Sequence, residues 1–157
     1  MATFVEHRIR PPKDKENLIQ QLSTDQEGPF QTRYQTLIFA AALGWARNRR
    51  EPLDRPGEGI RYELFRRHTT IEAFIDSLGV LDASTDASIM SDERLAERIG
   101  VFEEYANGGL AIIQGELNAG TRPMDVLLDF CRQGDSHSVE DDDFDEIFGR
   151  RRPETRS

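Results

Sequence analysis

The sequence predicts a mostly α protein: a compact helical domain of about five helices over residues 1–134, with a short extended N-terminal arm and a disordered acidic tail over residues 135–157. Two observations predict this. Apolar residues between Phe30 and Phe130 recur at spacings of three and four, the period of a helix face that packs on a core. Residues 135–148 hold seven acids and no Lys or Arg, so they bury too little apolar surface to offset the entropy of ordering.

The first predicted elements are the arm and a short helix. Residues 4–10 alternate loosely and then meet Pro11 and Pro12, which cannot continue a strand ladder. Proline suits the first turn of a helix, so a helix is predicted over about residues 12–23. Its apolar stripe consists of Leu18, Ile19 and Leu22.

Residues 31–48 form the clearest predicted helix and the centre of the core. Its apolar face is expected to carry Phe30, Tyr34, Leu37, Ile38, Ala41 and Trp45. Arginines follow at its C-terminal end, where cations complement the helix dipole. Residues 51–59 contain two prolines and two glycines and are predicted as a loop, whereas residues 60–65 fit either a short strand or the start of a helix.

Three more helices are predicted towards the C-terminus. Residues 69–72 resemble a capping box that opens a helix over about residues 69–79, and residues 81–90 form a loop. The next helix spans about residues 91–118 and contains Gly108 and Gly109. Two glycines cost about 2 kcal/mol of helix propensity, so they either break the helix or mark a tight crossing with another backbone. Since Leu110 resumes the apolar stripe in register, we predict one long helix, straight or kinked. A last helix places Val126, Leu127 and Phe130 inward.

The sequence offers little for catalysis. No apolar run approaches the roughly 20 residues that span a bilayer, and the first residues do not resemble a signal peptide, so we expect a cytoplasmic protein that binds no membrane. Cys131, the single cysteine, is expected to be a small core residue. The acids of residues 141–146 lack the ligand spacing and central glycine of a calcium loop. We therefore predict no metal, no cofactor and no catalytic residue.

Charge points to binding instead. The formal net charge of −9 divides into +3 over residues 1–68 and −12 over residues 69–157. Arginine clusters on one face would form a patch for a phosphate backbone or an acidic protein surface, although exposed arginines are also common at helix ends. The candidate nucleic-acid or partner-binding residues are Arg47, Arg49, Arg50, Arg66 and Arg67. In the tail, Phe144, Ile147 and Phe148 stand among acids at helical spacing and are candidate partner-docking residues, with a solvated charge run as the alternative.

Three segments also resemble a known family. Residues 9–15 (IRPPKDK), the core helix over residues 37–44 with the following REPL of residues 50–53, and residues 102–110 (FEEYANGGL) are similar to the bacterial family called Dnd system-associated protein 4. The likeness covers about residues 8–118, and the acidic tail beyond residue 134 lies outside it. The layout of the helices is more loosely similar to DndE, a small helical DNA-binding protein of the modification machinery.

The resemblance implies a context rather than a chemistry. Proteins of this family are encoded beside Dnd systems, which place sulfur in the DNA backbone (phosphorothioation), and beside restriction proteins that act on unmodified DNA. We expect a non-enzymatic accessory or adaptor protein. Its expected partners are other Dnd-type modification or restriction proteins, with DNA and a second copy of the chain as further candidates. Direct DNA binding regulated by the acidic tail is the alternative, and a small nuclease is a weaker one.

Overall fold

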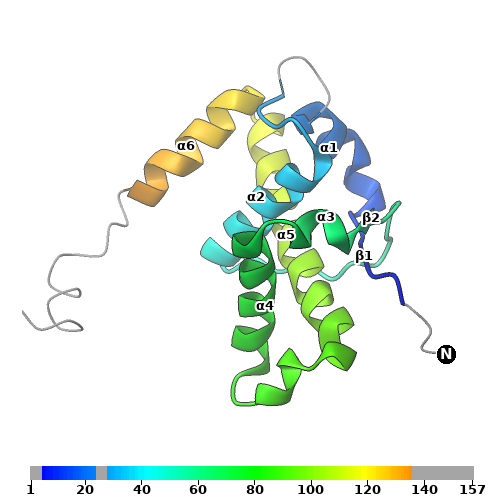
Figure 1. Ribbon diagram of the computed structural model, residues 1–157. Coiled ribbons are helices and arrows are strands. Elements are labelled where there is room, and N and C mark those ends of the chain that lie inside the picture. Colours follow the sequence, from blue (N-terminus) through cyan, green and yellow to red (C-terminus); the bar gives the residue numbers. More distant parts are fainter. Residues whose placement is uncertain (1–4, 24–27, 136–157) are drawn as a thin grey trace, which may run out of the picture.

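The computed structural model describes residues 5–23 and 28–135, and it confirms the mostly α fold class. The described chain contains six α-helices: α1 (Glu16–Ser23), α2 (Arg33–Ala46), α3 (Tyr62–Arg66), α4 (Thr69–Ala83), α5 (Leu95–Asn118) and α6 (Pro123–Asp135). Strands β1 (Arg8–Ile9) and β2 (Ile60–Arg61) form a short antiparallel pair. Figure 1 shows α2, α4 and α5 packed together, with α1 and α6 at the same end of α5 and the strands at one side.

The extended arm pairs with the start of residues 60–65, the segment for which the sequence fits either a strand or a helix. Arg8 pairs with Arg61 and Ile9 with Ile60, so the extended arm is a strand because a second strand lies beside it. Directly afterwards the chain turns into α3, whose first residue Tyr62 donates its N–H to the His7 carbonyl at 3.0 Å. Residues 60–65 therefore form a short strand first and then the start of a helix, so both alternatives are present. Helix α3 is additional to the five helices that the sequence predicts.

The crossing of α2 and α5 is the centre of the fold and depends on glycine. A Cβ atom at Gly109 would lie 1.7 Å from the Ala40 carbonyl oxygen, and one at Gly44 would lie 2.1 Å from that of Tyr105. Only residues without a side chain permit this approach. The predicted tight crossing is confirmed, and α5 continues through Gly108 and Gly109 as one helix.

The buried side of α2 differs from the predicted face. Leu37 and Ala41 are buried as expected, but Ile38 is half-buried and Trp45 is 50% exposed. The buried residues are Thr36, Leu37, Ala40, Ala41, Leu43 and Gly44. Since α2 is apolar nearly all round, spacing alone could not show which side faces α5. Trp45 is consequently a surface residue.

Three smaller predictions are corrected. α4 continues to Ala83, four residues past the expected end, because residues 80–83 (VLDA) are all compatible with a helix, and it stops where Ser84 adopts a φ of 60°. The long helix begins with a 3-10 turn, Asp92–Arg94, before α5. Cys131 is exposed rather than in the core, since α6 turns Val126 inward and leaves the Cys131 side towards solvent.

Candidate functional site

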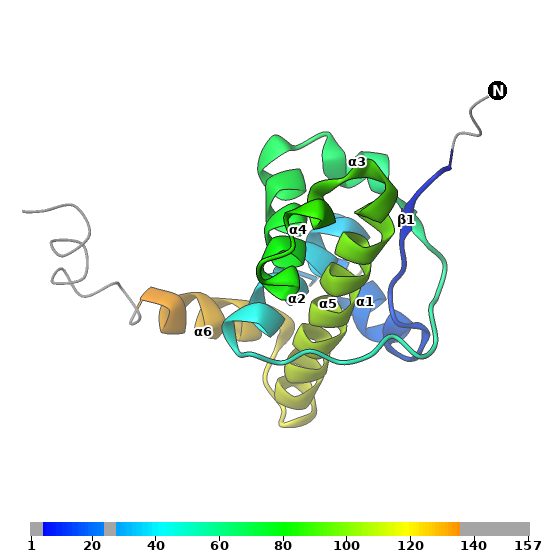
Figure 2. The same cartoon turned by 90° about the horizontal axis from the view of Figure 1, so that it is seen from below.

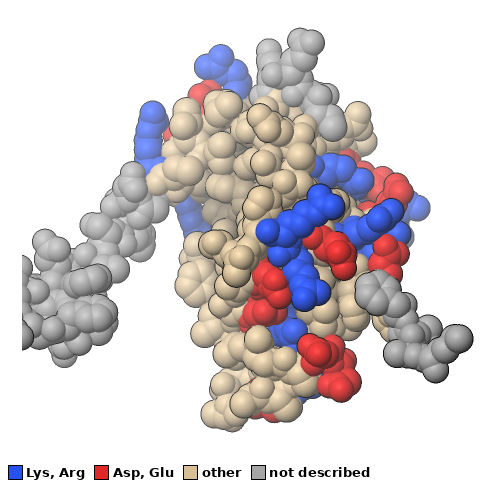
Figure 3. Space-filling model, in the orientation of Figure 1, with Lys and Arg blue, Asp and Glu red and all other residues tan. Residues whose placement is uncertain are grey.

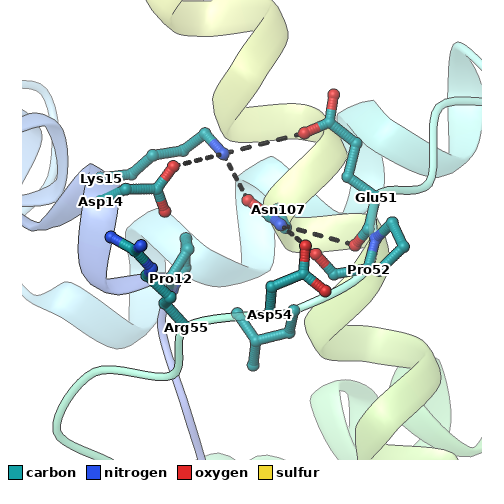
Figure 4. A pocket seen from close by; sticks show the side chains of 9 residues that line it. Pro12, Asp14, Lys15, Glu51, Pro52, Asp54, Arg55 and Asn107 are labelled. Carbon is teal, nitrogen blue, oxygen red and sulfur yellow. Dashed lines mark hydrogen bonds and ion pairs between the residues drawn. The ribbon is translucent and has the colours of Figure 1, made fainter.

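The segments that carry the family resemblance meet at one polar pocket, although they are up to about 100 residues apart in the sequence. Figure 4 shows this pocket between the N-terminal arm, the loop after α2 and the middle of α5. Its volume is about 290 Å³. We call it the Lys15 pocket. It is lined by Pro12, Asp14, Lys15, Glu51, Pro52, Leu53, Asp54, Arg55 and Asn107.

Lys15 is the central charge of the pocket, with only 13% of its side chain exposed. Its Nζ donates a hydrogen bond of 2.5 Å to Asn107 Oδ1. The ammonium also lies 3.7 Å from Asp14 Oδ2 and 3.8 Å from Glu51 Oε2. A largely buried ammonium requires such partners, because removing an unpaired charge from water is costly.

Asn107 joins the two loops through one side chain. While its oxygen accepts from Lys15, its Nδ2 donates to the Pro52 carbonyl at 3.0 Å and lies 3.5 Å from the Glu51 carbonyl. Asn107 is 6% exposed, so these carbonyls take the place of water around its amide. The side chain therefore fixes the start of the 51–57 loop against α5.

Gly108, next to Asn107, allows the chain after α2 to approach α5 closely. A Cβ atom at Gly108 would lie 2.1 Å from the Arg49 carbonyl oxygen. The Arg49 N–H donates to the Gly44 carbonyl at 2.7 Å, and the Glu51 N–H donates to the Glu104 carbonyl at 3.1 Å. Figure 2 shows the chain between α2 and β2 running across α5 from this point.

The other wall of the pocket is held by backbone bonds between the arm and the loop. The Lys13 N–H donates to the Arg55 carbonyl at 2.8 Å, and the Gly57 N–H donates to the Pro11 carbonyl at 2.7 Å. The pocket walls are thus built from two strand-like segments tied together and anchored on a helix. Asp14, Asp54 and Arg55 remain exposed at the rim.

An ion pair between the half-exposed Arg10 and the buried Glu103 anchors the arm one helical turn before Asn107. Glu103 is 3% exposed and accepts from the Arg10 backbone N–H at 2.6 Å and from Arg10 Nε at 3.2 Å. The hydrogen bonds to Glu103 and the attraction of its charge raise the pKa of Arg10. Glu103 and Asn107 lie four residues apart on α5, so one side of the helix binds the arm at two points.

The buried polar side chains of the pocket are bonded to one another, and no metal-binding group forms among the residues that the structure describes. Within residues 5–23 and 28–135, no group of three or more His, Cys, Asp or Glu side chains is placed to hold a metal ion. In the same ranges every buried side-chain nitrogen or oxygen has a hydrogen-bond partner. The described polar groups therefore act on one another, and the rim presents mixed charge to an outside molecule.

The five predicted arginines fall into two groups. Arg50 pairs with Asp82, in the last turn of α4, and with Glu104, whereas Arg66 lies 3.7 Å from Glu72, in the first turn of α4. Residues 72 and 82 of a helix are about 15 Å apart, so the groups lie at opposite ends of α4. Figure 3 accordingly shows blue and red side chains interleaved on this face.

The remaining arginines have different surroundings. Arg49 pairs with Glu51 at 2.9 Å, and Arg47 bonds to Gln133 and lies 5.3 Å from the centre of the Phe130 ring. Arg67 is exposed and has no ion pair among the described residues. The predicted docking residues Phe144, Ile147 and Phe148 lie outside the described residues.

The sequence prediction missed the residues that build the pocket. Lys15 and Asn107 are separated by 92 positions, and neither belongs to a motif with a known ligand spacing, although Lys15 lies in the mixed-charge run of residues 13–16. The available signal was indirect: Arg10, Lys15, Glu51, Glu103 and Asn107 all lie within the segments that resemble the family. These segments are packing motifs, because their side chains and backbone bond to one another.

The fold and the pocket define a small, mostly helical domain in which polar side chains fasten an arm and a loop to a close helix crossing. The chain matches the family described as DNA sulphur modification system-associated protein 4 over residues 8–148, and it belongs to that family. Neither a curated protein nor a solved structure was found to be similar to it.

The extent of the match corrects one expectation. The family likeness does not stop near residue 118 but continues to residue 148, so it includes the acidic segment and ends at Phe148. The matched range therefore includes the acidic residues up to position 148. One further finding concerns membranes: no helix in the part of the chain that the structure describes is long and apolar enough to cross one.

Proposed function

We propose that the chain is a non-enzymatic accessory protein of a bacterial DNA phosphorothioation (Dnd) system, which acts in the cytoplasm as an adaptor for a partner protein of that system. Membership of a family of system-associated proteins supports the Dnd context. The observation that carries the adaptor role is that the family-like segments converge on the Lys15 pocket, where the polar groups stabilise a surface shape.

The rim of this pocket is the proposed partner-binding surface. Asp14, Asp54 and Arg55 are exposed around the recessed Lys15, and Pro52 adds an exposed apolar ring. The backbone bonds between the arm and the loop hold these groups in place, which lowers the entropy cost of ordering them on binding. A partner segment with alternating charge would match this rim.

Co-purification from a host that carries a Dnd system tests the proposal. The tagged chain should recover a Dnd-type modification or restriction protein. The variant Asp54→Lys/Arg55→Glu should lose it, because both rim charges are reversed without touching a buried group. Arg122→Glu is the matched control, since Arg122 is 83% exposed and lies in the turn between α5 and α6. Failure of the unaltered chain to recover any Dnd-type protein contradicts the proposal.

Direct DNA binding is a second candidate. The observation that favours it is Arg67, which is exposed next to Arg66 and has no ion pair with any residue that the structure describes. In this reading Arg47, Arg49 and Arg50 form a second contact and the acidic tail competes with DNA. Replacing the three aspartates of residues 141–143 by asparagine should then strengthen a salt-sensitive DNA affinity. Adding Arg66→Ala and Arg67→Ala should reverse the gain. Negligible binding by all variants would exclude this candidate.

A further inference from the structure

The outer side of α2 forms an apolar groove that the described helices leave open. It has a volume of about 700 Å³ and is lined mainly by Phe30, Ile38, Phe39 and Ala42, with Ile71 from the first turn of α4. Ile38 and Ala42 are four residues apart and Trp45 follows three residues later, so the half-exposed Trp45 lies on the same side of α2, next to the residues that line the groove. Figure 3 shows mostly uncharged surface over α2, with charged side chains beside the start of α4.

We propose that this groove is the docking site for the acidic segment of the same chain, with Phe144, Ile147 and Phe148 entering it. The three residues have i, i+3, i+4 spacing, which places them on one side of a helix. Two aromatic rings and one branched side chain suit a groove lined by Phe30, Phe39 and Ile38. The family match covers residues 8–148 and so includes both the domain and this segment of the chain.

The chain is long enough to reach the groove. Gln133, near the end of α6, bonds to Arg47, which directly follows the last turn of α2. Ala42 lies five residues before Arg47, or about 7.5 Å along the helix. The nine residues from Asp135 to Phe144 span up to about 30 Å, enough to pass around a helix roughly 10 Å across.

Charge also favours this occupant. The segment carries six acids over residues 140–146. Arg67, which has no ion pair among the described residues, lies four positions before the groove residue Ile71. Opposite charges around an apolar contact orient the segment, and salt should weaken the docking.

Self-docking goes beyond the proposed adaptor function. A partner that binds the groove must release Phe144, Ile147 and Phe148, and a partner that binds these residues must open the groove. The two surfaces are thus coupled within one chain. Because this coupling is a property of the isolated protein, its test is independent of the co-purification test. Self-docking can be absent although a Dnd protein co-purifies, and it can be present although none does.

The single tryptophan of the chain reports on the groove. Acrylamide quenching of Trp45 fluorescence should be greater in the full-length variant Phe144→Ser/Ile147→Ser/Phe148→Ser than in the unaltered protein, with the emission shifted to the red. The control Ser136→Ala/Ser138→Ala, in the same tail, should match the unaltered protein. Circular dichroism verifies that every variant keeps its helices.

Two results would overturn the inference. Equal quenching of the triple variant and the unaltered protein would show that the segment does not cover the groove. Protection of Trp45 that rises with protein concentration, together with a dimer mass by light scattering, would place the segment of a second copy there instead. Protection that is independent of concentration and is weakened by salt supports docking within one chain.

Discussion

Replacing Gly109 by alanine tests the close crossing of α2 and α5, on which both the core and the Lys15 pocket depend. The new Cβ would lie 1.7 Å from the Ala40 carbonyl oxygen, and real Cβ contacts essentially never fall below 3.0 Å. The helices must therefore separate by at least about 1.3 Å. The obstacle is backbone on both sides, so no side chain can rotate away.

The expected magnitude follows from two opposing effects. Overpacking a core typically costs about 1–3 kcal/mol. Because the new Cβ meets rigid backbone, we expect a cost at the upper end of this range, about 3 kcal/mol. Alanine regains about 1 kcal/mol of helix propensity over glycine. We expect Gly109→Ala to lower the free energy of unfolding by about 2 kcal/mol.

Gly100→Ala is the matched control, since Gly100 lies on the same helix and a Cβ there meets no atom within 4 Å. This variant should be more stable than the unaltered protein by about 0.5–1 kcal/mol. Urea unfolding followed by far-ultraviolet circular dichroism measures both changes. If Gly109→Ala gains stability as Gly100→Ala does, the helices are not in backbone contact and the account of the crossing is wrong.

Two further predictions concern the pocket and the core. Lys15→Met should lower the free energy of unfolding by about 1–3 kcal/mol, because it leaves Asn107 Oδ1 buried without its donor. Lys13→Met, at an exposed neighbouring position, should change the free energy of unfolding little. Equal effects of the two substitutions in urea unfolding would contradict the role of Lys15. Burial, followed by the charges of Asp76 and Glu72, raises the pKa of Tyr62 from 10.0 to about 12. The unfolded chain releases this proton near pH 10 and the folded chain only near pH 12, so stability should fall as pH rises between these values. Tyr62→Phe should remove that part of the decline, and an unchanged pH profile would refute the assignment.

The sequence predicted the fold where local signals agree with tertiary packing. The long helix through Gly108 and Gly109 was predictable because the apolar stripe resumes at Leu110, and glycines at such a point indicate a close crossing. The strand Arg8–Ile9 could be expected only as an extended arm, since its partner lies more than 50 residues away. Trp45 was misplaced because α2 is apolar on both sides, and a period cannot choose between two apolar sides.

The candidate site was harder to predict for a physical reason. The density of positive charge in the sequence indicated the arginines as binding residues. In the structure, however, Arg49, Arg50 and Arg66 each form an ion pair with a nearby acid. Lys15 and Asn107 are single polar residues whose importance comes from burial, and burial depends on how distant segments pack. Only the resemblance of their segments to a family marked them.

Photo-crosslinking in a host with a Dnd system tests directly whether the pocket rim binds a partner protein of that system. A photoreactive residue replaces Asp54 at the pocket rim in one strain and Arg122, in the turn after α5, in another. We expect a crosslink from position 54 to a Dnd-type modification or restriction protein, and none from position 122. No crosslink to such a protein from position 54, or equal crosslinks from both positions, would contradict the claim that the pocket rim binds a partner of the Dnd system.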